Sequence, residues 1–197
     1  GETTFHDEIF GDITAPNADL DDQVLINLGR LGGEKNLDEL LNLFAEARQE
    51  NKNLKFLIVG DGPAREELEH RAQKLGIGDY VIFTGMVPPS EVQNYYQLGD
   101  VFVSASTSET QGLTYIEAAA NGLPLLCRQD ECLNDVLQEG KNGYEYTSAE
   151  EFLDAIDHVM HDPQWRDEAS KRSEEIASTF DKKSFGDAIE NVYESVL

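Results

Sequence analysis

The sequence predicts a doubly wound α/β domain, on the evidence of its length, its apolar runs and the helical stretches between them. The 197 residues suit one domain or at most two small ones, and 40% of them are hydrophobic, which allows a sizeable core. Short runs that are apolar on both faces alternate with longer amphipathic stretches. Because parallel strands need crossover connections, this alternation predicts a parallel sheet with helices covering both faces.

Five units of strand followed by helix can be placed in order. The first strand is expected at 24–28, an apolar run, and apolar residues at helical spacing follow from Leu37 to Phe44. The succession recurs four times, with strands at 56–59, 81–83, 101–103 and 124–127 and helices at 64–75, 91–98, 113–120 and 133–137. In such a domain the ligand is expected at the carboxyl ends of the strands, so the residues after each strand are the functional candidates.

The two ends of the chain differ from this pattern. Residues 1–22 hold seven acidic residues and no Lys or Arg, which predicts an acidic tail or interdomain linker before a domain at 23–197. The chain opens with Gly1 rather than methionine, which suggests processing or excision from a longer protein. From Ala149 onward the pattern predicts extra packing helices, with apolar stripes at Phe152, Ile156 and Val159 and at Ile189, Val192, Tyr193 and Val196.

Composition excludes several functional classes. The chain has 39 acidic and 15 basic residues, a formal net charge of −24, which argues against general binding to nucleic acid. Its two cysteines, Cys127 and Cys132, form neither a CxxC pair nor a disulfide framework, so we expect free thiols in a reducing, cytoplasmic compartment. No apolar run approaches the roughly 20 residues of a membrane span, and no basic residue precedes Arg30 to form a secretory leader.

The loop after the first strand is a candidate phosphate site. It reads Gly29-Arg30-Leu31-Gly32-Gly33-Glu34-Lys35-Asn36 and carries two cations five positions apart. Glycines let a backbone approach phosphate closely, Arg30 can bind two phosphate oxygens at once, and Lys35 adds a charge near the start of the next helix. The alternative is an ordinary turn with solvated cations, and the loop matches neither a P-loop nor a GxGxxG motif.

The segment 106–124 is the most informative. Gly112 permits an unusual turn just after a buried strand, and the amides that follow at a helix start can bind an anion. Glu109 and Glu117 could together accept hydrogen bonds from the hydroxyls of one ligand, such as a sugar. The alternative makes Glu109 a helix cap and Glu117 an exposed helix residue. The apolar residues around Glu117 favour the functional interpretation, because a solvated charge would be poorly placed among them.

Four motifs in order give the chain a family resemblance. They are Gly29-Arg30-Leu31 with Lys35-Asn36, Val59-Gly60-Asp61-Gly62-Pro63, Phe83-Thr84-Gly85, and Glu109 with Glu117 after seven intervening residues and Gly122-Leu123-Pro124. Together they resemble the group 1 glycosyltransferases of GT-B architecture. The resemblance runs from about Leu25 to the C-terminus and implies a Rossmann-like doubly wound parallel sheet, the C-terminal half of a GT-B fold, with the acceptor-binding N-terminal half missing.

The resemblance also implies roles for individual residues. Arg30 and Lys35, beside Gly29, would hold the donor diphosphate, and Glu117 the ribose hydroxyls. Glu109 would contact the transferred sugar, and the backbone around Val87 the base. Arg30, Lys35 and Glu109 would form the catalytic set, and the amides that contact sugar and phosphate would come from Thr110, Gln111, Gly112, Leu113 and Thr114. Such enzymes are typically retaining and metal-independent, so neither a metal nor another cofactor is expected.

Within the family, the segment 108–118 looks most like the bacterial diacylglycerol glucosyltransferases, with Gln111 where an aromatic residue is usual. This likeness implies UDP-glucose as donor and a lipid or glycan acceptor bound through the missing half. It also implies a cytoplasmic location, with the full-length protein at the inner face of the plasma membrane. Two alternatives stay open: a non-catalytic module that binds nucleotide sugars or proteins, and a UDP-sugar epimerase of GT-B build.

Overall fold

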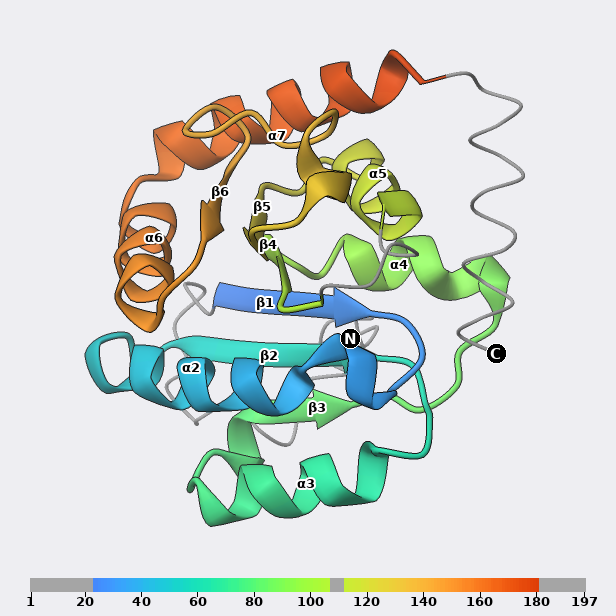
Figure 1. The fold of residues 1–197 in the computed structure, drawn as a ribbon, viewed down its shortest axis with the longest axis vertical. Coiled ribbons are helices and arrows are strands. Elements are labelled where there is room, and N and C mark those ends of the chain that lie inside the picture. Colours follow the sequence, from blue (N-terminus) through green and yellow to red (C-terminus); the bar gives the residue numbers. More distant parts are fainter. Residues whose placement is uncertain (1–22, 107–111, 181–197) are drawn as a thin grey trace, which may run out of the picture.

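A computed structural model describes residues 23–106 and 112–180 of the chain (Figure 1). Its centre is a six-stranded sheet in the order β3-β2-β1-β4-β5-β6, and every pairing between neighbours is parallel. The strands are β1 (Gln23–Leu28), β2 (Leu54–Val59), β3 (Val81–Phe83), β4 (Val101–Ser104), β5 (Leu125–Arg128) and β6 (Gly143–Tyr146). This confirms the predicted parallel α/β sheet.

Helices cover both faces of the sheet. The side chains of α2 (Leu37–Glu50), α3 (Arg65–Lys74) and α6 (Ala149–His161) contribute to one buried cluster. Those of α4 (Val92–Tyr96), α5 (Gly112–Ala120) and α7 (Pro163–Ser178) contribute to a second. Figure 1 shows α2 and α6 on one side and α7 running past α5 on the other. Burial of strand residues from both sides explains why their sequences are apolar throughout.

The sheet changes direction of growth between β1 and β4. From β1 the chain proceeds through β2 to β3 on one side, then returns to lay β4, β5 and β6 on the other. Strands β1 and β2 pair along their whole length, from Gln23 with Leu54 to Leu28 with Val59. Strands β1 and β4 pair only at Leu25 with Val101 and Ile26 with Phe102. The carboxyl ends of β1 and β4 therefore part at the topological switch point, where ligands of such sheets bind.

The C-terminal part of the sheet differs from the sequence prediction. No helix forms at 133–137; a short 3₁₀ helix at Glu131–Leu133 and turns take its place, because the segment is too short to close several helical turns. Strand β6 was not predicted. It starts at Gly143, where a Cβ would lie 1.9 Å from the carbonyl oxygen of Leu125, so only glycine fits against β5.

The packing helices agree with the prediction as far as the structure describes them. Phe152, Ile156 and Val159 on α6 are buried in the same cluster as the side chains of α2 and α3, as their spacing predicts. The second predicted stripe, Ile189 to Val196, lies outside the described residues, as does the acidic segment 1–22. The first described strand begins at Gln23, and the domain boundary there stays a prediction. Within the described ranges, every helix is too short or too polar to cross a bilayer.

Candidate functional site

The carboxyl ends of β1 and β2 are joined through two glycines. The amide of Gly29 donates to the carbonyl of Val59 at 3.0 Å. Gly29 has a φ of +141° and Gly60 a φ of +128°, values that residues with a Cβ rarely adopt. A Cβ on Gly60 would lie 2.1 Å from the carbonyl oxygen of Gly29. The close approach of the two backbones therefore requires glycine at position 60, and the positive φ favours glycine at position 29.

Lys35 is buried at this edge of the sheet. Its side chain leads back from the 3₁₀ helix Gly33–Lys35 to β1, where Nζ donates to the carbonyl of Leu28 at 3.1 Å, and the residue is only 6% exposed. The ammonium group occupies space that any larger residue at position 29 would need, since a Cβ on Gly29 would lie 1.7 Å from Nζ. Burial lowers the pKa of Lys35 from 10.5 to about 8, while the carboxylate of Glu34 acts in the opposite direction.

Arg30 has a different environment from Lys35. Its side chain is 54% exposed, and its nearest recorded ionic partner is Glu34, with 4.0 Å between Nη1 and Oε1. A contact of that length between exposed groups contributes little to stability. The guanidinium can therefore turn toward an anion at the carboxyl edge at small energetic cost.

The segment after β4 approaches the same loop. The Ser106 hydroxyl donates to the carbonyl of Glu34 at 3.3 Å, and the side chain of Asn36 donates to the carbonyl of Ala105 at 3.0 Å. These bonds link the loop that carries Arg30 and Lys35 to the chain that leads into α5. The predicted residues Glu109, Thr110 and Gln111 fall in this connection but lie outside the described residues.

Helix α5 begins at Gly112 and places Glu117 inside the protein. Gly112 and Leu113 are half-buried, and Thr114 is buried. Glu117 is 1% exposed, and the hydroxyl of Tyr96 on α4 donates to its Oε2 at 3.2 Å. The alternative of a solvated Glu117 is therefore wrong. A buried carboxylate held by a neighbouring hydroxyl is a fixed hydrogen-bond acceptor.

Val87 follows β3 on the same edge of the sheet. Its side chain is buried among the residues of α4 and α5, which leaves only its backbone as a candidate contact for a ligand. The turn before it is shaped by Gly85, with a φ of +74°, which forms an antiparallel bridge with Gly60. Met86, beside Val87, is 58% exposed. The structure thus brings the predicted loops after β1, β3 and β4 to one edge.

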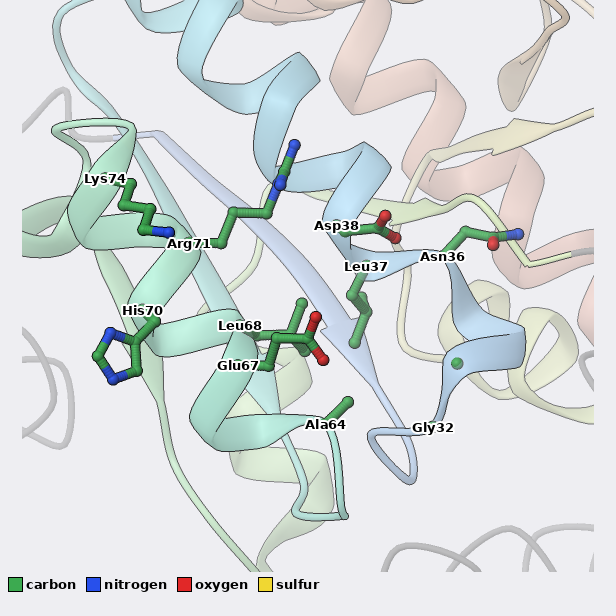
Figure 2. A pocket seen from close by; sticks show the side chains of 11 residues that line it. Gly32, Asn36, Leu37, Asp38, Ala64, Glu67, Leu68, His70, Arg71 and Lys74 are labelled. Atoms are coloured by element: carbon green, nitrogen blue, oxygen red, sulfur yellow. The ribbon is translucent and has the colours of Figure 1, made fainter.

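A separate cavity of about 410 Å³ lies between α2 and α3 (Figure 2). Both signs of charge line it, with Asp38 and Glu67 as acidic residues and Arg71 and Lys74 as basic ones. Figure 2 shows Arg71 reaching from α3 toward α2, where it binds the side-chain oxygen of Asn42 through two nitrogens at 2.9 and 3.2 Å. Gly32, Gly33 and Asn36 of the loop after β1 line this cavity, but Arg30, Lys35 and Glu117 do not. Its arrangement is that of a helix contact.

Sequence reasoning did not single out Asn27 or Tyr96, and it named Asn36 only as part of the loop and of the family motif. Asn27 and Asn36 reach across to β4, and Tyr96 holds Glu117. The amide at Asn27 is conspicuous within an apolar strand, which was an available signal. Nothing local distinguishes the other two, because their partners lie 69 and 21 residues away.

The sheet order and the parting of β1 from β4 define a doubly wound α/β domain of the class that binds nucleotides at its switch point. The chain belongs to the group 1 glycosyltransferases: the family model described as "Glycosyl transferases group 1" matches residues 12–176. The predicted resemblance is thereby confirmed.

Individual relatives narrow the comparison. The α-monoglucosyldiacylglycerol synthase of Acholeplasma laidlawii is 34% identical over 173 residues, 88% of this chain and 44% of that protein. The synthase of the same name from Streptococcus pneumoniae is 42% identical over 135 residues, 68% of this chain and 31% of that protein. The chain thus spans less than half the length of these relatives.

Solved structures agree on the fold. The pneumococcal O-GlcNAc transferase GtfA, in complex with UDP and GlcNAc, superposes with a TM-score of 0.75 and 26% identity, covering 94% of this chain and 38% of that one. The C-terminal domain of a group 1 glycosyltransferase from Francisella tularensis gives a TM-score of 0.72 at 20% identity, covering 88% of this chain and 91% of that one. The Rossmann-like half of a GT-B fold is therefore confirmed.

Proposed function

We propose that this chain is the donor-binding domain of a retaining glycosyltransferase that moves glucose from UDP-glucose to a lipid or glycan acceptor. The observation that carries the proposal is the desolvated ammonium of Lys35, placed against Gly29 at the switch point of the sheet. A diphosphate is the ligand group that matches a cation at this position. Relatives named as monoglucosyldiacylglycerol synthases support a glucose donor and a lipid acceptor.

The proposed roles follow the chemistry of the leaving group. When the bond between the sugar's anomeric carbon and the diphosphate breaks, the electron pair goes to a phosphate oxygen. Arg30 and Lys35 would stabilise the charge that develops there, Lys35 as a buried, preorganised cation and Arg30 by turning in from solvent. The acceptor hydroxyl would then bond to the anomeric carbon from the face that the diphosphate leaves, and its proton would pass to the departing phosphate oxygen.

The remaining site residues would fix the donor. Glu117 would accept hydrogen bonds from the ribose hydroxyls, and the backbone around Val87 would contact the base. Glu109 and the amides of residues 110–114 would contact the sugar and its phosphate. We further propose that no metal takes part and that the full-length protein works in the cytoplasm, at the inner face of the plasma membrane, with the acceptor bound by an N-terminal half.

Calorimetric titration of the chain with UDP, uridine, GDP and ADP tests donor binding. We expect UDP to bind and to stabilise the fold, by about 2.7 kcal/mol at 100 times its dissociation constant. Lys35→Ala should weaken UDP and leave uridine unchanged, while Lys171→Ala, which removes a lysine 72% exposed on α7, serves as the matched control. Absence of binding by all three nucleotides contradicts the proposal.

Product analysis distinguishes the alternatives. We expect the isolated chain to bind donor without transfer, because alignment of donor and acceptor in a closed cleft lowers the barrier by about 7–11 kcal/mol and needs both halves. The full-length protein should transfer glucose from UDP-glucose only when acceptor is present. An altered sugar without acceptor indicates an epimerase, and binding without any product from the full-length protein indicates a non-catalytic module.

A further inference from the structure

The gap between β1 and β4 is maintained by side chains that replace missing strand pairing. The pairing of the two strands ends at Ile26 and Phe102, although both strands continue. The amide of Phe102 donates to the carbonyl of Pro124 on the β5 side. Because backbone groups alternate in direction along a strand, the carbonyls of Val103 and Ala105 point to the β1 side. Without strand pairing, these buried carbonyls need other donors.

Three side chains donate hydrogen bonds to carbonyls at the two strand ends. Asn27 Nδ2 donates to the carbonyl of Val103 at 2.7 Å, and Asn36 Nδ2 donates to that of Ala105 at 3.0 Å. From the other strand, the carbonyl of Leu28 accepts from Lys35 Nζ at 3.1 Å. The separation of the two strand ends and the position of the lysine ammonium are thus parts of one hydrogen-bonded arrangement.

Asn36 lies at the junction between the 3₁₀ helix that ends with Lys35 and helix α2. It has φ +49° and ψ +40°, and within 23–106 and 112–180 it is the one residue other than glycine with a positive φ. Its backbone amide donates to the carbonyl of Gly33 at 3.2 Å and closes the 3₁₀ helix. Its own carbonyl accepts from Glu39 and Leu40 and starts α2. The left-handed turn therefore fixes the position of the preceding residue, Lys35, as well as the direction of the Asn36 side-chain amide.

We infer, on the basis of the proposed function, that Asn36 is a positioning residue for the donor diphosphate. It ties the loop that carries Lys35 to the end of β4 and so holds the ammonium at the switch point, without contacting the ligand itself. The bond from Ser106 to the carbonyl of Glu34 is a second tie between the same two segments.

Desolvation explains why such a tie is needed. A buried ammonium gains hydration by rotating into solvent, and Lys35 loses only one recorded hydrogen bond in doing so. Among the described residues, Glu34 is the charged group that acts on the Lys35 ammonium, and Glu34 itself lies 4.0 Å from Arg30. A loop that is free to move away from β4 would let the Lys35 ammonium move away from the carbonyl of Leu28 into solvent.

The test uses two substitutions with different backbone consequences. Asn36→Gly keeps the left-handed turn and removes the amide, whereas Asn36→Asp keeps the shape and cannot donate to Ala105 when ionised. The matched control is Asn51→Asp at the other end of α2, where Nδ2 donates to the carbonyl of Ala47 at 3.1 Å. Chemical denaturation verifies that each variant is folded before UDP and uridine are titrated.

Both Asn36 variants should weaken UDP roughly 3- to 10-fold and leave uridine unchanged, as expected for one hydrogen bond acting through a cation. The pH profile gives a second readout. In the parent protein UDP affinity should begin to fall above pH 8, where Lys35 titrates, and in Asn36→Gly the fall should move to higher pH as the lysine becomes solvated.

The outcomes separate this inference from the proposed function. If the parent protein binds UDP and the Asn36 variants bind it equally well, Asn36 has no positioning role. Equal weakening of uridine and UDP makes Asn36 a general structural residue and also overturns the inference. If the parent protein does not bind UDP at all, the proposed function fails, and this inference fails with it.

Discussion

Replacing Gly29 by alanine would test whether UDP binding depends on the place of the Lys35 ammonium. The new Cβ would lie 1.7 Å from Nζ and 2.9 Å from Cε of Lys35, a distance no packing allows. Because the tip of a lysine side chain is flexible, we expect Lys35 to move out rather than the strands to separate. The backbone strain of alanine at φ +141° should lower the free energy of unfolding by about 1–3 kcal/mol.

Displacement of the Lys35 ammonium should also weaken UDP binding. A hydrogen bond to a charged group is worth roughly 1.5–3 kcal/mol, so loss of the lysine contact should weaken UDP roughly 10- to 150-fold. Uridine, which has no phosphate, should bind as before. Urea unfolding gives the stability, and calorimetry gives both dissociation constants.

Two further variants make the prediction for Gly29→Ala specific. Gly33→Ala places a Cβ in open space in the same loop and should change neither stability by more than about 0.5 kcal/mol nor UDP affinity. The double variant of Gly29→Ala with Lys35→Ala should bind UDP no more weakly than Lys35→Ala alone, because the two changes remove the same interaction. Additive losses would refute the reasoning, since alanine would then block the ligand directly.

Three other predictions concern the remaining site residues. The pKa of Lys35 is lowered from 10.5 to about 8, so the ligand-free protein should gain stability as pH rises between these values. Over the same pH range UDP should bind more weakly, because it favours the charged amine. Calorimetry in buffers of different ionisation enthalpy measures the proton taken up when UDP binds. Arg30→Ala should weaken UDP more than uridine, whereas Glu117→Gln should weaken both, and equal losses for Arg30→Ala would place that residue away from the phosphates. Tyr96→Phe should weaken UDP and uridine by the same factor, because its hydroxyl holds Glu117, and unchanged uridine binding would contradict this role.

The sequence predicted the central strands because burial on both faces makes them apolar without interruption. Strand β6 lies at the sheet edge, and Tyr144 and Glu145 within it are half-buried, so it carried no such signal. The segment 133–137 was apolar enough to suggest a helix, but Leu133 and Val136 are buried from a 3₁₀ helix and the turns after it. Apolar spacing over five residues does not distinguish these structures.

Candidate residues could be named where charged side chains follow a strand end. Sheet topology made Lys35 and Glu117 candidates, and the apolar neighbours of Glu117 correctly indicated its burial. The burial of Lys35 could not be predicted in the same way. It depends on the absent Cβ of Gly29 and on the register at which β1 and β4 separate, which no local pattern of residues reports.

The buried lysine would also reconcile a strongly acidic protein with the proposed diphosphate ligand. At a net charge of −24 the long-range field repels a diphosphate, but salt screens that field over about 8 Å. Lowering the pKa of Lys35 from 10.5 to about 8 corresponds to a cost on the order of 3 kcal/mol for holding the ammonium charged in the crevice. The fold meets that cost before any ligand arrives. In the proposed site a phosphate would meet an ammonium that burial has already desolvated, so attraction at short range, where screening is weak, would outweigh the distant repulsion.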